Sequence, residues 1–280
     1  MSALIEAIKS ELLDAIKNDK LILPTLPEVA LRVREAAENP DVGINELTKV
    51  ISNDAALTAR IIKVVNSPLL RSSAEISDLN MAVSRLGISY TASLAMGLAM
   101  KQMFQATSDV VDRRLREVWS RSTEVAGISH VLCRQFTRLK PDQATLAGLV
   151  HQIGILPILT YAEANHQLLS DSFTLEKVIE QLHPQLGQRI LQTWDFPPAL
   201  IDVPIEQFNF ERQTAETDYV DIVQVALLHS YAGTEHPLGQ ADWGQIDAFR
   251  KLGLETAEHT LDNDEDLTAS MEAATKMLQV

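Results

Sequence analysis

Apolar residues recur every three or four positions along most of this 280-residue chain. The clearest runs cover residues 4–17, 55–66 and 111–136. Charged side chains fill the opposite side of each run, as in amphipathic helices. Another helix is expected from Pro27 to about Asn39, because proline suits a first helical turn. The pattern predicts a chain built of helices.

The C-terminal half continues the helical pattern, with breaks at proline and glycine. Helices are expected over residues 142–164, 174–182, 184–194 and 221–231, with an acidic last helix near the chain end. Residues 105–112 lack a periodic apolar pattern and form the expected hinge. We therefore expect an N-terminal helical subdomain over 1–106 and a second helical subdomain over 107–280.

Composition and charge limit the cellular compartments and the kinds of partner that we expect for this protein. The chain carries 38 acidic and 24 basic side chains, a net charge of −14. Nucleic-acid binding is disfavoured, because affinity for phosphates comes largely from Lys and Arg. The basic residues of 111–136 are expected to pair with acidic neighbours. No apolar run reaches the ~18 residues of a membrane span, and no signal-peptide layout is present. With one cysteine, Cys133, we expect a cytoplasmic protein without disulfides.

Residues 79–101 follow a helix-turn-helix pattern, with Gly87 in the turn and Ser89 as the expected cap of the second helix. A DNA-reading helix presents Arg, Lys, Asn or Gln to the bases. The second helix here has no such residue before Lys101 and is rich in Ala, Leu and Met. It is therefore predicted to pack inside a helical bundle.

One apolar stretch, residues 148–159, contains a histidine and an amide, His151 and Gln152. A buried polar group without a partner costs about 1–3 kcal/mol. These two side chains therefore need hydrogen-bond partners or a ligand, and the stretch marks a site or the remains of one. The structural alternative for His151 is a core histidine bonded to Gln152 or to a backbone carbonyl.

This stretch resembles the L-L-H-D-I-G-K-L signature of the HD superfamily of metal-dependent phosphohydrolases, with Gln152 at the Asp position and Ile155 at the Lys position. Four ordered motifs further resemble the HDOD family. They are LPTLPEV at 23–29, SNDAALTAR at 52–60, VNSP at 65–68 and AVSRLGI at 82–88. The resemblance implies an all-α, HD-domain-like helical bundle preceded by an N-terminal helical subdomain.

The resemblance also implies that most metal ligands are replaced. The segment VWSRSTEVA at 118–126 is similar to the family's W-x-H-S-x-x-V-A, which puts Arg121 at the first histidine position. The segment IVQVAL at 222–227 matches a motif ending V-A-D, so Leu227 stands at the last aspartate position. Carboxylate ligands neutralise a metal and help it to activate water. Of these ligands, His151 survives.

His183 begins HPQLG, which resembles the H-P-x-x-G run of HD-GYP phosphodiesterases, where the histidine is an additional ligand. His151 and His183 are thus an alternative site for a divalent metal, because imidazoles suit zinc. Arg121, a permanent cation, opposes a metal there. Otherwise His183 caps a helix begun by Pro184. We expect no cofactor.

The expected pocket combines the surviving and the replacing residues. They are Arg121, His151, Gln152, His183 and Glu206. Arg121 must find an anion, because desolvating an unpaired guanidinium is costly. We expect Glu124 or Glu206 to supply it internally, and a small anion from solvent is the second expectation.

Two functions follow from these expectations. The preferred one is a non-catalytic regulatory module of bacterial signalling that acts through protein partners, with a vestigial pocket for a small anion. The alternative is a metal-dependent phosphohydrolase with a divergent site built from His151, His183 and Glu206. The missing carboxylates at 152 and 227 favour the first.

Overall fold

The computed structural model describes residues 6, 8, 10–11, 14, 23–70, 75–240, 242–254 and 265–279. Every regular element within these ranges is helical and none is a strand, which confirms the predicted all-α class. The helix predicted over 4–17 lies mostly outside the described residues. The helices are α2 (Glu28–Glu38), α3 (Ile44–Ser52), α4 (Ala55–Val65), α5 (Leu79–Leu86), α6 (Ile88–Met100), α7 (Asp109–Phe136), α8 (Pro141–Val150), α9 (Ile155–Ala164), α10 (His166–Ser170), α11 (Ser172–Thr193), α12 (Pro198–Ile201), α13 (Val203–Glu206), α14 (Tyr219–Ser230), α15 (Asp247–Lys251) and α16 (Glu265–Leu278), with 3-10 turns at Lys101–Met103, Pro237–Gln240 and Trp243–Gln245.

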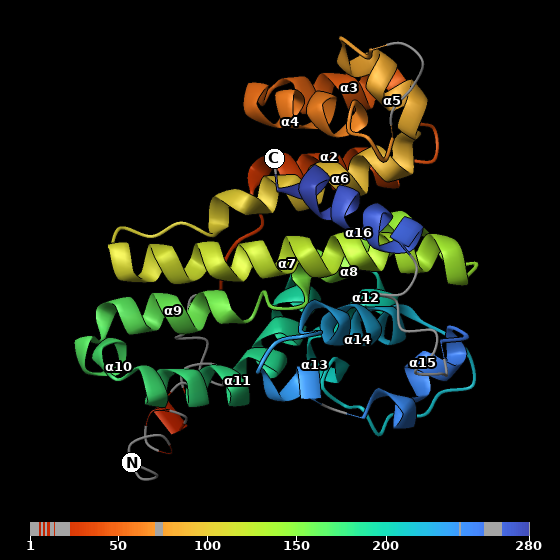
Figure 1. Cartoon of the computed structure of the whole chain (residues 1–280). Coiled ribbons are helices and arrows are strands. Elements are labelled where there is room, and N and C mark those ends of the chain that lie inside the picture. Colours follow the sequence, from red (N-terminus) through yellow and green to blue (C-terminus); the bar gives the residue numbers. More distant parts are fainter. Residues whose placement is uncertain are drawn as a thin grey trace.

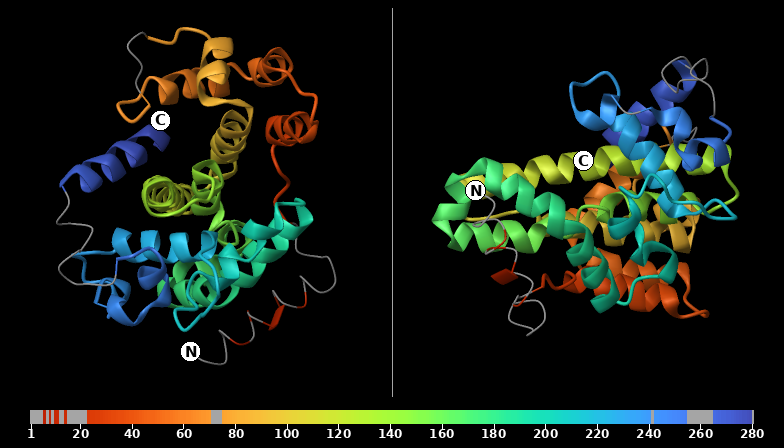
Figure 2. Two further views of the ribbon diagram at one scale, coloured as in Figure 1. Left: turned by 90° about the vertical axis from the view of Figure 1, so that its right-hand side faces the viewer. Right: turned by 90° about the horizontal axis from the view of Figure 1, so that it is seen from below.

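The 28-residue helix α7 is the axis of the molecule, as the long apolar repeat over 111–136 predicted. In Figure 1 it crosses the centre, with α2–α6 above it and α9–α15 below. Helices α8, α14 and α16 all pack against it. In the left view of Figure 2, α7 is seen nearly end-on, with α16 to its left, α8 to its right and α14 below it. Its buried face therefore anchors the C-terminal helices, and α2–α6 join them mainly through the packing of α6 against α8.

Helix α6 is an interior helix. Its residues from Thr91 to Met100 are all buried, between α2 on one side and α8 on the other. A helix that is apolar all round belongs in a core, and the predicted packing role is confirmed. Gly87 takes a φ of +82° in the turn before it, as its residue type suggested. The predicted cap at Ser89 is wrong, because α6 begins at Ile88 without a side-chain cap.

The segment predicted as a hinge is fastened to α9. The Ser108 backbone N–H and the Thr107 hydroxyl both donate to Glu163 Oε1, at 2.7 and 3.1 Å. The buried apolar side chains of both halves form one continuous cluster. The division into 1–106 and 107–280 stays a prediction.

Two predicted helix boundaries are wrong, and they lie next to the two candidate histidines, His183 and His151. Residues 174–182 and 184–194 form a single helix, α11, with Pro184 inside it. Residues 142–164 instead form two helices, α8 and α9, separated by a turn at 151–154. A Cβ atom on Gly154 would lie 2.0 Å from the His183 carbonyl oxygen. The turn therefore packs backbone to backbone against α11, and only glycine fits there.

One segment, Pro141–Ala164, is long and apolar enough to cross a membrane by a criterion that tolerates scattered polar residues. This revises the expectation that no such stretch exists. Of its 18-residue apolar window, 83% is buried against the rest of the fold. It comprises α8, the turn and α9. Its hydropathy is therefore that of a core segment.

Candidate functional site

A cavity of about 630 Å³ opens between α7, α9 and α11, and residues 236–238 form one of its walls. Arg121 on α7, Gln152 in the turn after α8, and His183 on α11 all line it. His151, next to Gln152, is fully buried. The fold thus brings together four of the five predicted site residues.

Arg121 is held in three ways. Its Nη1 donates to Glu124 Oε2 at 3.0 Å and to the Ser230 carbonyl oxygen at 2.9 Å. Its guanidinium lies over the Tyr231 ring, 4.4 Å from the centroid. Ser230 is the last residue of α14, so the cation also meets the negative end of that helix. Arg121 therefore ties α7 to α14 at the place where the resemblance implies a metal.

The Arg121 side chain is 30% exposed, and its internal anion is Glu124. Burial raises the pKa of the Glu124 carboxyl above its usual value, and the nearby Arg121 offsets only part of this rise. The pairing makes sense on one helix, since residues three apart share a face. Of the two acids expected to pair with Arg121, Glu124 is therefore the one found.

Glu206 does not belong to this cavity, which corrects its predicted place. Its Oε2 accepts from Asn209 Nδ2 at 2.8 Å and lies 4.0 Å from Arg212 Nε. Arg212 also binds Asp218 and the buried Asp221, the latter at 2.7 Å. Glu206 is therefore part of an ion-pair network that stabilises the start of α14.

His151 is a core histidine whose imidazole meets a backbone carbonyl, as one of the two expectations had it. Its Nδ1 lies 2.6 Å from the Gly148 carbonyl oxygen. Because a carbonyl only accepts, Nδ1 carries the proton and Nε2 is left as an acceptor. Nε2 is buried without a partner among the described residues. Burial lowers the pKa of His151 to about 4. The Gly148 hydrogen bond raises this pKa, and the nearby Arg121 lowers it further.

His183 lies in the interior of α11 and is 3% exposed, so the helix-cap expectation is wrong. Its ring meets Phe208 edge to face at 5.7 Å. Its Nδ1 is buried without a partner in the described chain. Burial, and then the nearby His151, lower the pKa of His183 to about 3. Both imidazoles are therefore neutral near pH 7, and each has an unsatisfied nitrogen.

The residues at the implied ligand positions do not supply the oxygen ligands of a hard divalent metal. Within the described ranges, no three His, Cys, Asp or Glu side chains cluster closely enough to hold a metal ion. Leu227, at the last ligand position, is 1% exposed in the core. Hard divalent ions require oxygen ligands, whereas here Arg121 occupies the neighbouring carboxylate, Glu124.

Sequence reasoning missed three aromatic side chains of the cavity. Tyr231 and His236 stack at 3.9 Å, and Phe208 also lines the cavity. Tyr231 lies one turn beyond Leu227, so the motif match ending there already pointed toward it. Phe208 and His236 lie in loops, where no periodicity signals them.

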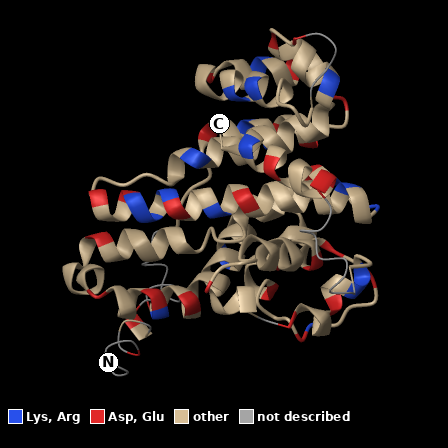
Figure 3. Ribbon diagram, in the orientation of Figure 1, with Lys and Arg blue, Asp and Glu red and all other residues tan. Residues whose placement is uncertain are grey.

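The cations of α7 are mostly paired, as predicted. Arg114 on α7 binds Glu176 on α11, and Arg116 binds Asp112 at 2.7 Å. Blue and red segments alternate along α7 in Figure 3. The cavity wall therefore offers little uncompensated positive charge.

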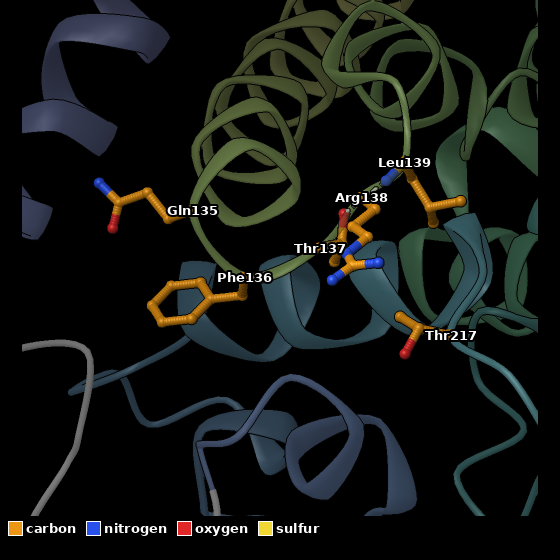
Figure 4. Close-up of a pocket in the computed structure, with 6 residues that line it drawn as sticks. All are labelled: Gln135, Phe136, Thr137, Arg138, Leu139 and Thr217. Atoms are coloured by element: carbon orange, nitrogen blue, oxygen red, sulfur yellow. Dashed lines mark hydrogen bonds between the residues drawn. The ribbon is translucent and has the colours of Figure 1, made fainter.

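A second hollow, of about 480 Å³, lies at the turn between α7 and α8. Figure 4 shows that its side chains do not converge, since Gln135 and Phe136 extend to one side while Leu139 and Thr217 lie on the other. None of its lining residues has a buried polar atom without a partner. This hollow carries no sign of a ligand site.

Comparison with known proteins identifies the family to which this fold belongs. A family model described as "HDOD domain" matches residues 23–209. A "putative metal-dependent phosphohydrolase" from Shewanella amazonensis SB2B superposes with a TM-score of 0.87 at 32% identity, covering 99% of this chain and 100% of that one. The fold is thus that of the HD-like helical proteins. The chain belongs to the HDOD family.

More distant structures share the fold. An "HDOD domain protein with unknown function" from Geobacter sulfurreducens has a TM-score of 0.66 at 19% identity, covering 99% of each chain. A "putative signal transduction protein" from Marinobacter aquaeolei VT8 has a TM-score of 0.65 at 21% identity, covering 99% of this chain and 66% of that one. An uncharacterized protein of Treponema pallidum (strain Nichols) is 23% identical over 85% of this chain. The chain spans about half, 49%, of that relative's length.

Proposed function

We propose that this HDOD protein is a non-catalytic regulatory module that acts through protein partners and keeps the former metal pocket as a site for a small ligand. One observation carries the proposal. Arg121 stands where a metal ligand is expected, and its guanidinium is hydrogen-bonded to Glu124 and to the last carbonyl of α14. A guanidinium here supplies positive charge without activating water, so the pocket is suited to binding.

Relatives support a regulatory role by name, although their names describe those proteins. The Marinobacter protein is called a signal transduction protein. The Shewanella protein is named as a phosphohydrolase, and an enzyme is therefore the competing function. It would need His151 and His183 to hold a metal beside Arg121.

A hydrolysis assay separates the two functions. The full chain is incubated with bis(p-nitrophenyl) phosphate and Mn²⁺, Mg²⁺, Fe²⁺ or Ni²⁺. We expect no metal-dependent release of nitrophenol. Turnover that disappears in His151→Ala, with the fold intact by circular dichroism, would overturn the proposal.

A restored variant tests the assignment of ligand positions. Arg121→His, Gln152→Asp and Leu227→Asp together return the implied ligand set, and the folded triple variant is expected to take up Mn²⁺ or Fe²⁺. A folded triple variant without metal would show that these positions do not converge. Affinity capture from native lysate, with Gln152→Leu as matched bait, tests whether partner binding depends on the pocket.

A further inference from the structure

We propose that the cavity binds an uncharged, planar ligand that carries both hydrogen-bond donors and acceptors, such as a carboxamide on an aromatic ring. The inference rests on the proposed retention of this pocket for a small ligand, and it names the ligand's class. It departs from the small anion that the arginine suggests. Three features of the cavity carry it: its charge, its unpaired polar atoms and its apolar surface.

The charge of the cavity disfavours anions. Its two arginines are already paired, Arg121 with Glu124 and Arg114 with Glu176. The other charged residues of the lining are the acids Glu117 and Glu180, of which Glu180 pairs with Lys177 at 2.6 Å. An incoming anion would meet the Glu117 carboxylate and find each lining guanidinium occupied. Like-charge contact of this kind costs affinity.

The unpaired polar atoms belong to neutral groups. His183 lines the cavity, is almost fully buried and has no partner for Nδ1 in the described chain. His151 is fully buried outside the lining, and its Nε2 also has no partner in the described chain. A neutral imidazole donates from one nitrogen and accepts at the other, and the Gln152 amide beside it does both. Of these groups the half-buried Gln152 amide is open to the cavity, and a ligand with both donors and acceptors satisfies both of its atoms, whereas a simple anion only accepts.

The rest of the lining is apolar and fits a ring. Val118, Ile155, Leu159 and Ile179 form the walls, and Phe208 is 38% exposed at the rim. The lining on α7 extends from Arg114 to Arg121, seven helical steps or ~10 Å along the axis. The Arg114–Glu176 pair bridges α7 and α11 at one end. This space admits one or two fused rings.

Three probes of one shape and different charge test the proposal: benzamide, benzoate and benzamidine, which are neutral, anionic and cationic. Each is titrated into the full-length protein, and binding is followed by the NMR signals of the Gln152 side-chain amide and the His183 imidazole. Benzamide is expected to bind at least about fivefold more tightly than either charged probe, which is ~1 kcal/mol.

Substitutions locate the binding. Gln152→Leu removes the amide at a half-buried position and is expected to weaken benzamide at least about fivefold. Gln135→Leu, in the hollow of Figure 4, is the matched control and is expected to leave binding unchanged. Equal loss in both variants overturns the proposal.

Other results overturn it as well. Tighter binding of benzoate assigns the cavity to anions, and tighter binding of benzamidine assigns it to cations. Absence of benzamide binding up to its solubility limit rejects the ligand class. None of these results bears on catalysis, which the phosphodiester assay decides separately, so failure of this inference and of the proposed function remain distinguishable.

Discussion

Three buried histidines couple the stability of this protein to pH. Burial lowers the pKa of His130 and of His151 to about 4, and that of His183 to about 3. In the unfolded chain each imidazole titrates near pH 6.5. Between the folded and unfolded pKa values, the unfolded chain binds protons and the folded protein does not. The stability they contribute is fully present above pH 6.5 and is lost as the pH falls toward 4.

We therefore predict that the free energy of unfolding falls below pH 6.5, by up to ~1.4 kcal/mol per pH unit for each buried histidine. Urea denaturation at successive pH values measures the slope. His151→Gln should lower the slope by the amount that corresponds to one bound proton. His166→Gln, on an exposed side chain, should leave the slope unchanged. A slope identical in both variants would contradict the buried neutral state of His151.

The Arg121 contacts predict a structural cost of losing that side chain. Arg121→Met leaves the Glu124 carboxylate and the Ser230 carbonyl without their donor, and unfolding should become easier by ~1–2 kcal/mol. Arg116→Met removes an exposed pair with Asp112 and is the control, with an expected change below ~0.5 kcal/mol. Equal changes in urea denaturation would mean that Arg121 does not tie α7 to α14.

Residue identities predicted much of the site, because ligand replacements are visible in the motifs. Arg121, Gln152 and His183 do line one cavity. The acid that pairs with Arg121 was harder to choose. Glu124 shares its helix and was within reach by spacing. Glu206 instead meets Arg212, six residues further on in an irregular segment, where no helical spacing predicts the contact.

At the scale of the helices, local rules failed where tertiary packing overrides them. Proline inside a helix removes one hydrogen bond and predicts a break, yet α11 continues through Pro184. Its neighbours His183 and Gly187 are buried against the turn that contains Gly154. That contact is invisible in the sequence of α11 alone. The long repeat of α7, by contrast, needed only its own periodicity.

Helix α16 lies beyond residues 23–209 and packs against α7 at a glycine. A Cβ on Gly127 would come within 2.6 Å of the Thr275 backbone nitrogen. We predict that Gly127→Ala destabilises the protein by ~1–3 kcal/mol, although alanine in a free helix interior would gain ~0.5–1 kcal/mol.

The sign of this change is the test. Urea denaturation gives the stability, and hydrogen exchange of the amides at 265–278 should become faster if α16 is pushed off α7. Ser120→Ala on the exposed side of α7 is the control. A stabilised Gly127→Ala variant would show that α16 does not depend on this contact.

At the scale of the whole molecule, the charge distribution argues against nucleic acid as the partner. The net charge is −14, and the helix that would read bases in a helix-turn-helix is buried between α2 and α8. Arg60 and Lys63 on α4 and Lys101 after α6 form a local group of cations. Burial, and then Arg60 and Lys63, lower the pKa of Lys101.

Three cations release few counterions, so any attraction to a duplex should vanish as salt rises. We predict no sequence-specific DNA binding at about 0.15 M salt, where charges more than ~8 Å apart are screened. Fluorescence anisotropy with labelled duplexes measures this for the full chain and for Lys101→Glu. Weak binding confined to low salt and reduced in the variant would be non-specific attraction to the cation group. Binding that persists at 0.15 M, distinguishes sequences and is lost in Lys101→Glu would mean that α6 leaves the core to reach the groove, against the burial of ten consecutive residues from Thr91 to Met100.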